Sequence, residues 1–409
     1  MADQGLFTAS NFLVSILLAR WLSPQDYGAF AVAYAVFWLV GVVHNALLTE
    51  PMLVFGSDRH KGRFTKYLGV LLYGHVGFGV VCALLLLSAG LVAGLTGSRA
   101  LSLSLLALAG ASPFMLLQVL MRRACYVNFR PHLAALGGTL YMFVMLGGAY
   151  LLYQAGKLSA VTAFGLMGLS GLAVGLLLVA VLRLRLPSSD DGALIRLSLN
   201  DHWNYGSWSV GTRTMVWVTE SSYFLILPIW GGLEASAALR ALMNLIMPVL
   251  QSYAALSVLL LPALVQARGG AAFGRVARLS LVLFVSGSAL YWLVLGLFHR
   301  PLIDWMYDGR YNDYSHLIWV LALVPIIFGV AEVQSTVLRA LEKVDLVFWA
   351  SVVSTALALT AGLGAVYALG VPGAVVWLLL SGAANVLAMW WFTSYGPKRW
   401  RDTGGAGGG

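Results

Sequence analysis

The stretch from Leu68 to Leu95, LGVLLYGHVGFGVVCALLLLSAGLVAGL, decides the fold class of this chain. It contains no Asp, Glu, Lys or Arg, and it exceeds the about 20 apolar residues with which a helix crosses roughly 30 Å of hydrocarbon. It also lacks the alternation of polar and apolar residues that is typical of strands in a membrane β-barrel. The stretch therefore predicts a transmembrane helix.

The composition of the whole chain points the same way. Of its 409 residues, 60% are hydrophobic and only 10% are charged, against roughly 25% charged residues in a soluble domain. The mean hydropathy is +0.84. So few polar residues do not cover the surface of a soluble protein of this size. The composition predicts an all-α integral membrane protein with many spans.

Twelve stretches are long and apolar enough to be membrane spans. They are 5–22, 28–56, 68–95, 101–121, 132–154, 160–182, 204–230, 235–262, 279–298, 316–338, 347–369 and 373–395. Turn-forming residues such as Gly231-Gly232 separate neighbouring spans. The longest connection lies near the chain centre, which predicts an N-terminal six-helix bundle over 1–186, a cytoplasmic linker over 187–203, a C-terminal six-helix bundle over 204–396 and a cytoplasmic tail over 397–409.

The distribution of Lys and Arg predicts the orientation. Most of the 25 basic residues fall in loops on one side and in the tail, so both termini are expected in the cytoplasm. One local signal disagrees, because Arg20 lies at the far end of the first span. The net charge of +9 then reflects topology, and no nucleic-acid partner is expected.

Several other site types are not expected. The spacing of Cys82 and Cys125 fits neither a disulfide framework nor a metal site, and no metal or organic cofactor is expected. No nucleotide-binding GxxxxGK[ST] pattern occurs. The segment Met1–Gly5 has no basic residue, so no cleavable signal peptide is expected. The long outer loop around 304–314 is rich in aromatic and acidic residues, which suits either sugar contacts or an interfacial aromatic belt.

Three motifs near the start of the chain resemble one family. They are Asp3–Leu13 (DQGLFTASNFL), Leu17–Phe30 (LLARWLSPQDYGAF) and Asn45–Met52 (NALLTEPM). These motifs resemble the Wzx-like polysaccharide exporters of the multidrug/oligosaccharidyl-lipid/polysaccharide (MOP) superfamily. The resemblance implies a MATE-like fold, in which two six-helix bundles surround a central cavity that opens alternately to each side of the membrane.

The resemblance also implies a function. The oligosaccharide branch of the superfamily moves polyprenyl-pyrophosphate-linked glycan from the cytoplasmic to the periplasmic leaflet of the bacterial inner membrane, for exopolysaccharide or O-antigen assembly. The implied partners are this glycan, membrane lipids, and polysaccharide polymerase and export machinery. A second hypothesis is export of small organic cations, as in the multidrug branch. A membrane glycosyltransferase or polymerase is less favoured, because the first outer loop is short.

Arginines in two spans are candidate ligands for the pyrophosphate. Arg240, Asn244 and Gln251 follow a spacing of i, i+4 and i+11, which places them on one face of a helix. Arg213 and Glu220 both lie in the preceding predicted span, 204–230, and are seven residues apart. Guanidinium groups stay charged and can fork onto phosphate oxygens. The alternative is a structural ion pair between Arg213 and either Glu220 or Glu332.

Further polar residues are candidates for the cavity. Arg20 is expected either to bind pyrophosphate or to extend to the membrane interface. Asn11 and Asn45, together with Asn244 and Gln251, are expected to contact sugar hydroxyls or to tie helices together.

Glu50, Glu220 and Glu332 are the acids within the predicted spans. Each is expected either to take up H⁺ or Na⁺ as a coupling ion or to neutralise an arginine. Pro51 directly follows Glu50 and predicts a local hinge. His44 is expected to be a packing residue or, less favourably, a proton relay.

Overall fold

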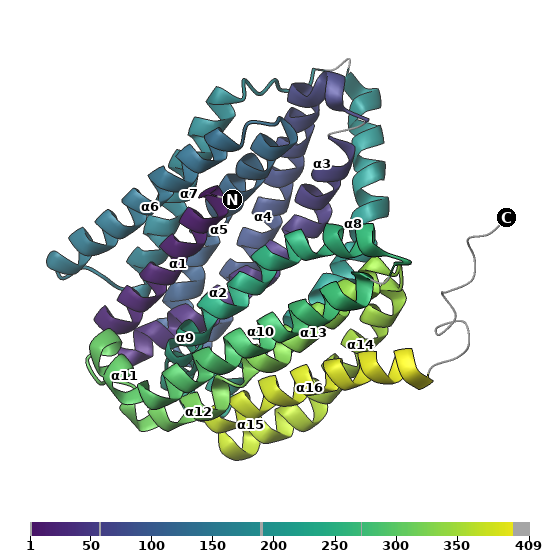
Figure 1. Cartoon of the computed structure of the whole chain (residues 1–409). Helices are drawn as coiled ribbons and strands as arrows, with labels where there is room; N and C mark the ends of the chain where they lie inside the picture. Colours follow the sequence, from purple (N-terminus) through teal and green to yellow (C-terminus); the bar gives the residue numbers. More distant parts are fainter. Residues whose placement is uncertain (1, 57–58, 189–190, 271, 396–409) are drawn as a thin grey trace. The chain divides into compact units, whose positions relative to one another are not determined.

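The computed structural model describes residues 2–56, 59–188, 191–270 and 272–395, and every regular element within these ranges is a helix. Figure 1 shows the helices in chain order. This confirms the predicted all-α fold class. The predicted tail over 397–409 lies outside the described residues.

Ten helical segments among the described residues are long and apolar enough to cross a membrane. Two features explain the difference from the twelve predicted spans. The first helix contributes a shorter apolar segment, Phe7–Trp21. Two predicted spans, 204–230 and 235–262, also fall within one long helical segment, Gly192–Ala267. This segment is interrupted at Gly232, which has non-helical angles of φ 71° and ψ 175°. The predicted Gly231-Gly232 turn therefore lies where the helical run breaks.

The chain forms two compact units, Met1–Trp217 and Val218–Gly409. Helix α8, Gly192–Ser221, begins inside the predicted linker 187–203. The first unit therefore includes a long stretch of the seventh predicted span, and the predicted bundle boundaries at 186 and 204 stay predictions.

Before α8, the described part of the first unit contains seven α-helices, one π-helix and one 3₁₀-helix. They are α1 (Ala2–Trp21), α2 (Pro24–His44), the π-helix η1 (Asn45–Thr49), α3 (Glu50–Phe55), the 3₁₀-helix η2 (Lys61–Arg63), α4 (Phe64–Leu95), α5 (Arg99–Val127), α6 (Pro131–Gln154) and α7 (Ala160–Val181). Ser23 caps α2 by accepting a hydrogen bond from the backbone of Asp26 at 3.1 Å, and Ser159 begins α7 with a capping box.

Small residues let α7 approach α5 closely. Gly168 and Gly171 lie on one face of α7, and a Cβ atom at Gly168 would lie 2.9 Å from Ala111 on α5. A Cβ atom at Gly171 would lie 2.7 Å from the backbone carbonyl oxygen of Phe114. Close backbone contact of this kind is a common source of helix association in membranes, where apolar burial alone gives little driving force.

The second unit is also helical. Its elements are α9 (Tyr223–Ala267), α10 (Ala272–Leu297), α11 (His299–Tyr307), η4 (Asn312–Leu317), α12 (Ile318–Leu321), α13 (Val324–Ala340), α14 (Val344–Leu357), the π-helix η5 (Ala358–Gly362), α15 (Leu363–Leu369) and α16 (Val371–Tyr395). One apolar core joins α9, α10 and α13 around Tyr253, Leu264 and Phe284.

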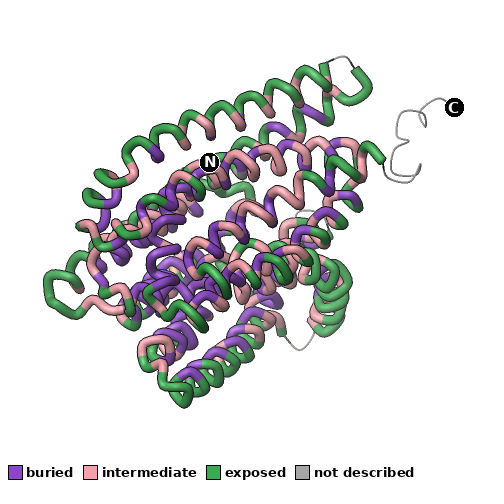
Figure 2. Tube along the Cα trace, turned by 90° about the horizontal axis from the view of Figure 1, so that it is seen from below, coloured by how far each residue is buried: buried purple, intermediate pink, exposed green. Residues whose placement is uncertain are grey.

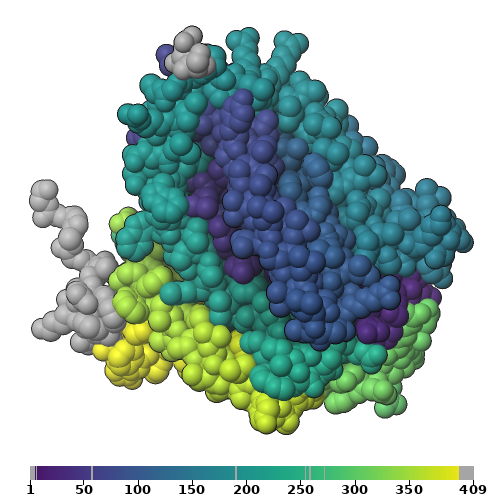
Figure 3. All heavy atoms as spheres, turned by 180° about the vertical axis from the view of Figure 1, so that it is seen from behind, coloured from purple at the N-terminus to yellow at the C-terminus, as the bar shows by residue number. Residues whose placement is uncertain are grey.

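The outer faces of the helices are apolar, as a lipid-facing surface requires. Figure 2 shows exposed residues running along whole helices rather than only at loops. On α4, Leu84, Leu85 and Leu91 are all more than half exposed, and Figure 3 shows this part of the chain as a blue band open on the surface. Such a surface is excluded from water and fits the interior of a bilayer.

Candidate functional site

A proline opens the second predicted span at its most polar point. Pro51 has no N–H to donate to the carbonyl of Leu47, four residues earlier. The helix widens into the π-turn Asn45–Thr49 directly before Glu50 and Pro51. The Leu47 carbonyl oxygen accepts a hydrogen bond from Nδ1 of His202 on α8, at 2.8 Å. The proline thus provides an attachment point for α8.

One face of α8 packs on this opened helix. His202, Gly206, Ser209, Arg213 and Trp217 have the spacing i, i+4, i+7, i+11 and i+15, which places them on one stripe. At Gly206, a Cβ atom would lie 2.8 Å from the Ala46 carbonyl oxygen, so only glycine fits without a shift. At the other end, Nε1 of Trp217 donates to the carbonyl oxygen of Ala35 at 3.1 Å.

The centre of this stripe holds the polar cluster that we call the Glu50 cluster, formed by Asn45, Glu50, Ser209 and Arg213. The Ser209 hydroxyl donates to Oε2 of Glu50 at 2.6 Å, and Arg213 forms an ion pair with Oε1. The Asn45 amide donates to Oε1 at 3.5 Å. The Glu50 side chain is 16% exposed, whereas that of Arg213 is 55% exposed. The carboxylate is thus held inside the unit while the guanidinium keeps an open side.

The structure therefore brings together three predicted residues, Asn45, Glu50 and Arg213. The ion-pair partner of Arg213 is Glu50, so the alternative that paired Arg213 with Glu220 or Glu332 is wrong. The residues are 163 positions apart in sequence, and no periodic pattern connects them. The role of the cluster in transport stays a prediction.

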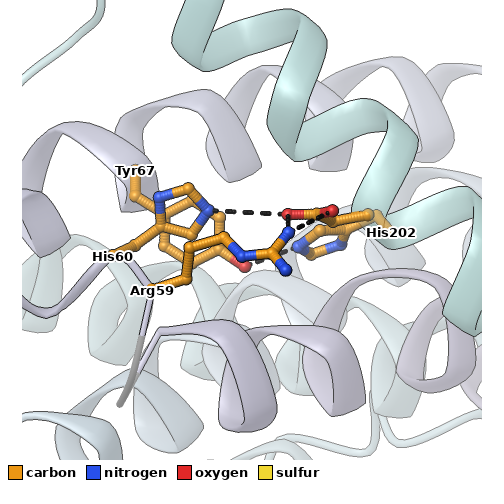
Figure 4. A network of polar contacts seen from close by, with 5 residues as sticks. Arg59, His60, Tyr67 and His202 are labelled. Atoms are coloured by element: carbon orange, nitrogen blue, oxygen red, sulfur yellow. Dashed lines mark hydrogen bonds and ion pairs between the residues drawn. The ribbon is translucent and has the colours of Figure 1, made fainter.

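A second network fixes the start of α8 (Figure 4). Arg59 donates to both carboxylate oxygens of Asp201 at 2.6 Å, and Nε2 of His202 lies 2.6 Å from the Tyr67 hydroxyl. The ring of His60 stacks on Tyr67 with centroids 4.1 Å apart. Since Nδ1 of a neutral His202 donates to Leu47, its Nε2 accepts from Tyr67. Ser209 and Arg213 lie two and three turns further along α8, so this network positions the Glu50 cluster.

Charge and burial compete at His60. Burial lowers the pKa of His60 from its ordinary value of 6.5, the nearby Asp201 carboxylate opposes this shift, and Arg59 adds to it. Sequence reasoning missed the network, because it treated the segment around Arg59 only as a basic topological loop and the segment before residue 203 as a linker. Contacts between segments so far apart in the chain produce no local sequence motif.

Asn11 lies among helix-packing contacts. Its Oδ1 accepts from the Tyr141 hydroxyl at 3.0 Å, and its Nδ2 donates to the carbonyl of Phe7 at 3.0 Å. These bonds favour the alternative that Asn11 ties α1 to α6. Arg122 lies nearby, only 6% exposed, with its guanidinium carbon 4.1 Å from the Phe7 ring centroid. The predicted span 101–121 ended directly before Arg122, but α5 continues to Val127.

Two further candidate residues, Arg20 and His44, lie at helix ends in the first unit. Arg20 lies in the last turn of α1 and is half-buried. His44 is fully buried at the end of α2, and its Nε2 lies 3.1 Å from Nδ1 of His75 on α4. His44 thus forms a buried hydrogen bond with a second imidazole, an arrangement that agrees with hydrogen-bonded packing, and a role as a proton relay stays a prediction.

The second unit has a separate polar group near the start of α9. Glu220 at the end of α8 is exposed, Glu332 on α13 is half-buried, and the two acids are neighbours. Buried Tyr223 is influenced by the charges of both Glu220 and Arg240. The guanidinium carbon of Arg240 lies 5.9 Å from the Phe224 ring centroid. Tyr223 therefore lies near one candidate coupling acid, Glu220, and one candidate pyrophosphate ligand, Arg240.

The polar stripe on α9 is unevenly exposed. Arg240 is half-buried, Asn244 is buried and Gln251 is exposed. The helical spacing is as predicted, but the three side chains have different surroundings, and their contact with a substrate stays a prediction. Among the described residues, no group of three or more His, Cys, Asp or Glu side chains is arranged to hold a metal ion.

Comparison with known proteins shows both a family match and a fold match. Residues 241–402 match a family described as "Polysaccharide biosynthesis protein". A search of the curated proteins finds no significant match. The matched residues lie in the second half of the chain and span less than half of it, whereas the motifs that resemble polysaccharide exporters lie near the start.

Solved structures show the same fold across nearly the whole chain. An inward-facing multidrug resistance MATE family transporter of the MOP superfamily is 13% identical, covers 96% of this chain and 94% of its own, and has a TM-score of 0.78. The lipid II flippase MurJ, in an inward closed conformation, is 12% identical, covers 97% and 88%, and has a TM-score of 0.76. A MOP superfamily transporter from Pyrococcus furiosus is 14% identical, covers 98% and 93%, and has a TM-score of 0.63. The predicted MOP fold is therefore confirmed.

Proposed function

We propose that this membrane protein is a flippase, which moves polyprenyl-pyrophosphate-linked oligosaccharide from the cytoplasmic to the periplasmic leaflet of a bacterial inner membrane by alternating access. The observation that carries the proposal is the polysaccharide biosynthesis match over residues 241–402, in a chain whose fold resembles a lipid II flippase. The transported glycan would serve exopolysaccharide or O-antigen assembly, together with a polymerase and export machinery. Both termini would face the cytoplasm.

Arg213 is the best-supported ligand for the pyrophosphate in the first unit. Its guanidinium is held on one side by Glu50 and is more than half exposed. A guanidinium carries five N–H donors, so contact with one carboxylate oxygen leaves others for phosphate oxygens. In the second unit, Arg240 would have the same role, and Arg20 is a weaker third candidate because it lies at the end of α1.

Glu50 would couple ion uptake to substrate binding. Glu50 and a pyrophosphate would compete for Arg213, because both are anions that accept hydrogen bonds from the same guanidinium. A proton or Na⁺ on Glu50 would weaken the ion pair and release Arg213 to the substrate. Glu220 and Glu332 are alternative coupling acids, because one bound H⁺ or Na⁺ would relieve the repulsion between them.

Export of organic cations is the second candidate. The fold match to a multidrug transporter and the neighbouring acids Glu220 and Glu332 favour it. In the first unit, however, the Glu50 carboxylate is paired with Arg213, so it offers little net negative charge to a cation. The lipid-linked substrate is therefore preferred.

A transport assay separates the two candidates. The purified protein would be reconstituted in liposomes that contain a labelled polyprenyl-pyrophosphate oligosaccharide, under imposed Na⁺, H⁺ or voltage gradients. We expect movement between leaflets with wild type and loss of movement with Arg213→Ala and Arg240→Ala. Arg196→Ala, which removes a charge outside both polar groups, is the matched control. Absence of glycan movement together with efflux of a cationic dye would reverse the preference.

A further inference from the structure

A second cationic feature lies in the first unit, where α5 and α7 end. A cavity of about 640 Å³ opens there, lined by Arg130, Arg183 and Arg185 together with Thr65, Asn128 and two apolar residues of α7 and its C-cap. We call it the arginine pocket. It shares no residue with the Glu50 cluster or with the network of Figure 4.

The backbone around the pocket is fixed by two helix ends of the same type. After α5, Phe129 takes a left-handed φ of 55°, and the Arg130 N–H bonds to the Cys125 carbonyl at 2.8 Å. After α7, Arg183 takes a left-handed φ of 51°, and the Leu184 N–H bonds to the Val179 carbonyl at 3.3 Å. These are Schellman-type ends, in which glycine is the usual left-handed residue.

Arginine therefore occupies a position at 183 where glycine would relieve backbone strain. The next arginine is also anchored, because the Arg185 N–H bonds to the Thr65 carbonyl on α4 at 3.3 Å. Ordered helix ends and a tie to a third helix hold the three arginine backbones in place. The loops that carry them are distant in sequence, yet they converge on one cavity.

No acid among the described lining residues balances the charge of the pocket. The two helix C-termini each contribute about half a negative charge, which leaves about two positive charges uncompensated. Lys66, next to Thr65 of the lining, pairs with Asp191 at 3.0 Å. The Ser188 backbone N–H, followed by Lys66, lowers the pKa of Asp191, so this carboxylate is ionised but already paired.

The surroundings identify the kind of anion. Phe129 is 80% exposed and Leu186 is 58% exposed, and each adjoins an arginine of the pocket. Apolar side chains beside a cationic pocket suit the boundary between headgroups and acyl chains. Forked guanidinium groups bind phosphate oxygens, and the Asn128 amide and Thr65 hydroxyl add neutral polar contacts. The positive-inside rule explains on which side arginines lie, but not their convergence on one cavity.

We propose that the arginine pocket binds the phosphate headgroup of an anionic phospholipid of the surrounding membrane. The site goes beyond the proposed transport function and uses none of its residues. Binding there would join the ends of α5 and α7 to the start of α4, and would thereby make the stability of the first unit depend on lipid composition.

The test measures lipid binding without transport. Purified full-length protein in neutral detergent is titrated with phosphatidylglycerol, phosphatidylcholine or inorganic pyrophosphate, and bound species are counted by native mass spectrometry. We compare wild type with the triple variant Arg130→Gln, Arg183→Gln, Arg185→Gln. The control triple variant Lys61→Gln, Arg63→Gln, Arg196→Gln removes the same charge on the same side. Each basic residue near an anionic surface contributes about a fivefold change in affinity, so the pocket variant should bind phosphatidylglycerol on the order of a hundredfold more weakly.

The single variant Arg183→Gly keeps the test decisive if the triple variant fails to fold. Glycine suits φ 51° at this position, so the fold should be retained while affinity for phosphatidylglycerol falls about fivefold. Equal losses in the control triple variant, equal binding of phosphatidylcholine, or unchanged binding by Arg183→Gly would each overturn the proposal. Binding of inorganic pyrophosphate without binding of phosphatidylglycerol would also overturn it, because the source would then be a soluble phosphate.

Discussion

Replacing Glu50 by Gln should tighten the binding of pyrophosphate rather than weaken it. The substitution keeps the shape of the side chain and leaves an amide oxygen to accept from Ser209, which now donates to Oε2 at 2.6 Å. It removes the negative charge that competes for Arg213. The fold should therefore survive, while the guanidinium becomes available to an added anion.

The magnitude follows from the exposure of the pair. A fully buried ion pair would be worth several kcal/mol, but Arg213 is 55% exposed, so solvent screens the interaction. An interaction of about 1 kcal/mol remains, which corresponds to about a fivefold change in affinity. Binding of inorganic pyrophosphate, measured by calorimetry on the purified protein, should be about fivefold tighter for Glu50→Gln and weaker for Arg213→Ala.

A double-mutant cycle separates competition from a general charge effect. In the Arg213→Ala background, Glu50→Gln should give no further gain, because no guanidinium is left to release. Asp26→Asn removes a charge elsewhere in the first unit and should leave affinity unchanged. A fivefold gain that persists without Arg213, or a loss of affinity in Glu50→Gln alone, would refute the competition between Glu50 and pyrophosphate.

Three further predictions concern the attachment of α8. Gly206→Val should lower stability by about 1–3 kcal/mol, because the valine side chain would overlap the Ala46 carbonyl. Thermal unfolding measures this loss. The control is Gly211→Val, because Gly211 has open space around it. His202→Phe should lower stability by about 1–3 kcal/mol by leaving the Leu47 carbonyl and the Tyr67 hydroxyl without this partner, and a melting temperature equal to that of wild type would contradict the attachment. His60 has a folded pKa below 6.5, so the unfolded state binds more protons and stability should fall as pH decreases below about 6.5. His60→Phe keeps a ring on Tyr67 and should flatten this part of the curve of melting temperature against pH; a curve as steep as that of wild type would show that other groups cause it.

Local sequence predicted the helices well, because each span is specified by its own hydropathy. The stretch Leu68–Leu95 lies inside α4, which runs from Phe64 to Leu95. The Gly231-Gly232 turn also has a local cause, since Gly232 takes φ 71°, which is unfavourable for residues with a side chain. The predicted turn therefore coincides with the kink that divides α9.

Contacts between distant segments could not be predicted in the same way. The sequence suggested Glu220 or Glu332 as the ion-pair partner of Arg213. The partner in the structure is Glu50, which comes from the second predicted span. The predicted span 101–121 ended directly before Arg122, yet this residue lies inside α5 and is buried against Phe7. Both errors have one physical origin: the energy of a polar group in a membrane depends on its partner, and the partner is set by packing rather than by spacing.

Pro51 connects local sequence to the candidate site. Because it lacks an N–H, the helix cannot use the Leu47 carbonyl in the ordinary way, and that oxygen accepts from His202. The attachment fixes the rotation of α8, since Gly206 lies on the same face and allows close approach to Ala46. With this rotation set, Ser209 and Arg213 face Glu50, the residue directly before the proline. The interruption of one helix and the placement of a charged pair are therefore consequences of the same missing donor.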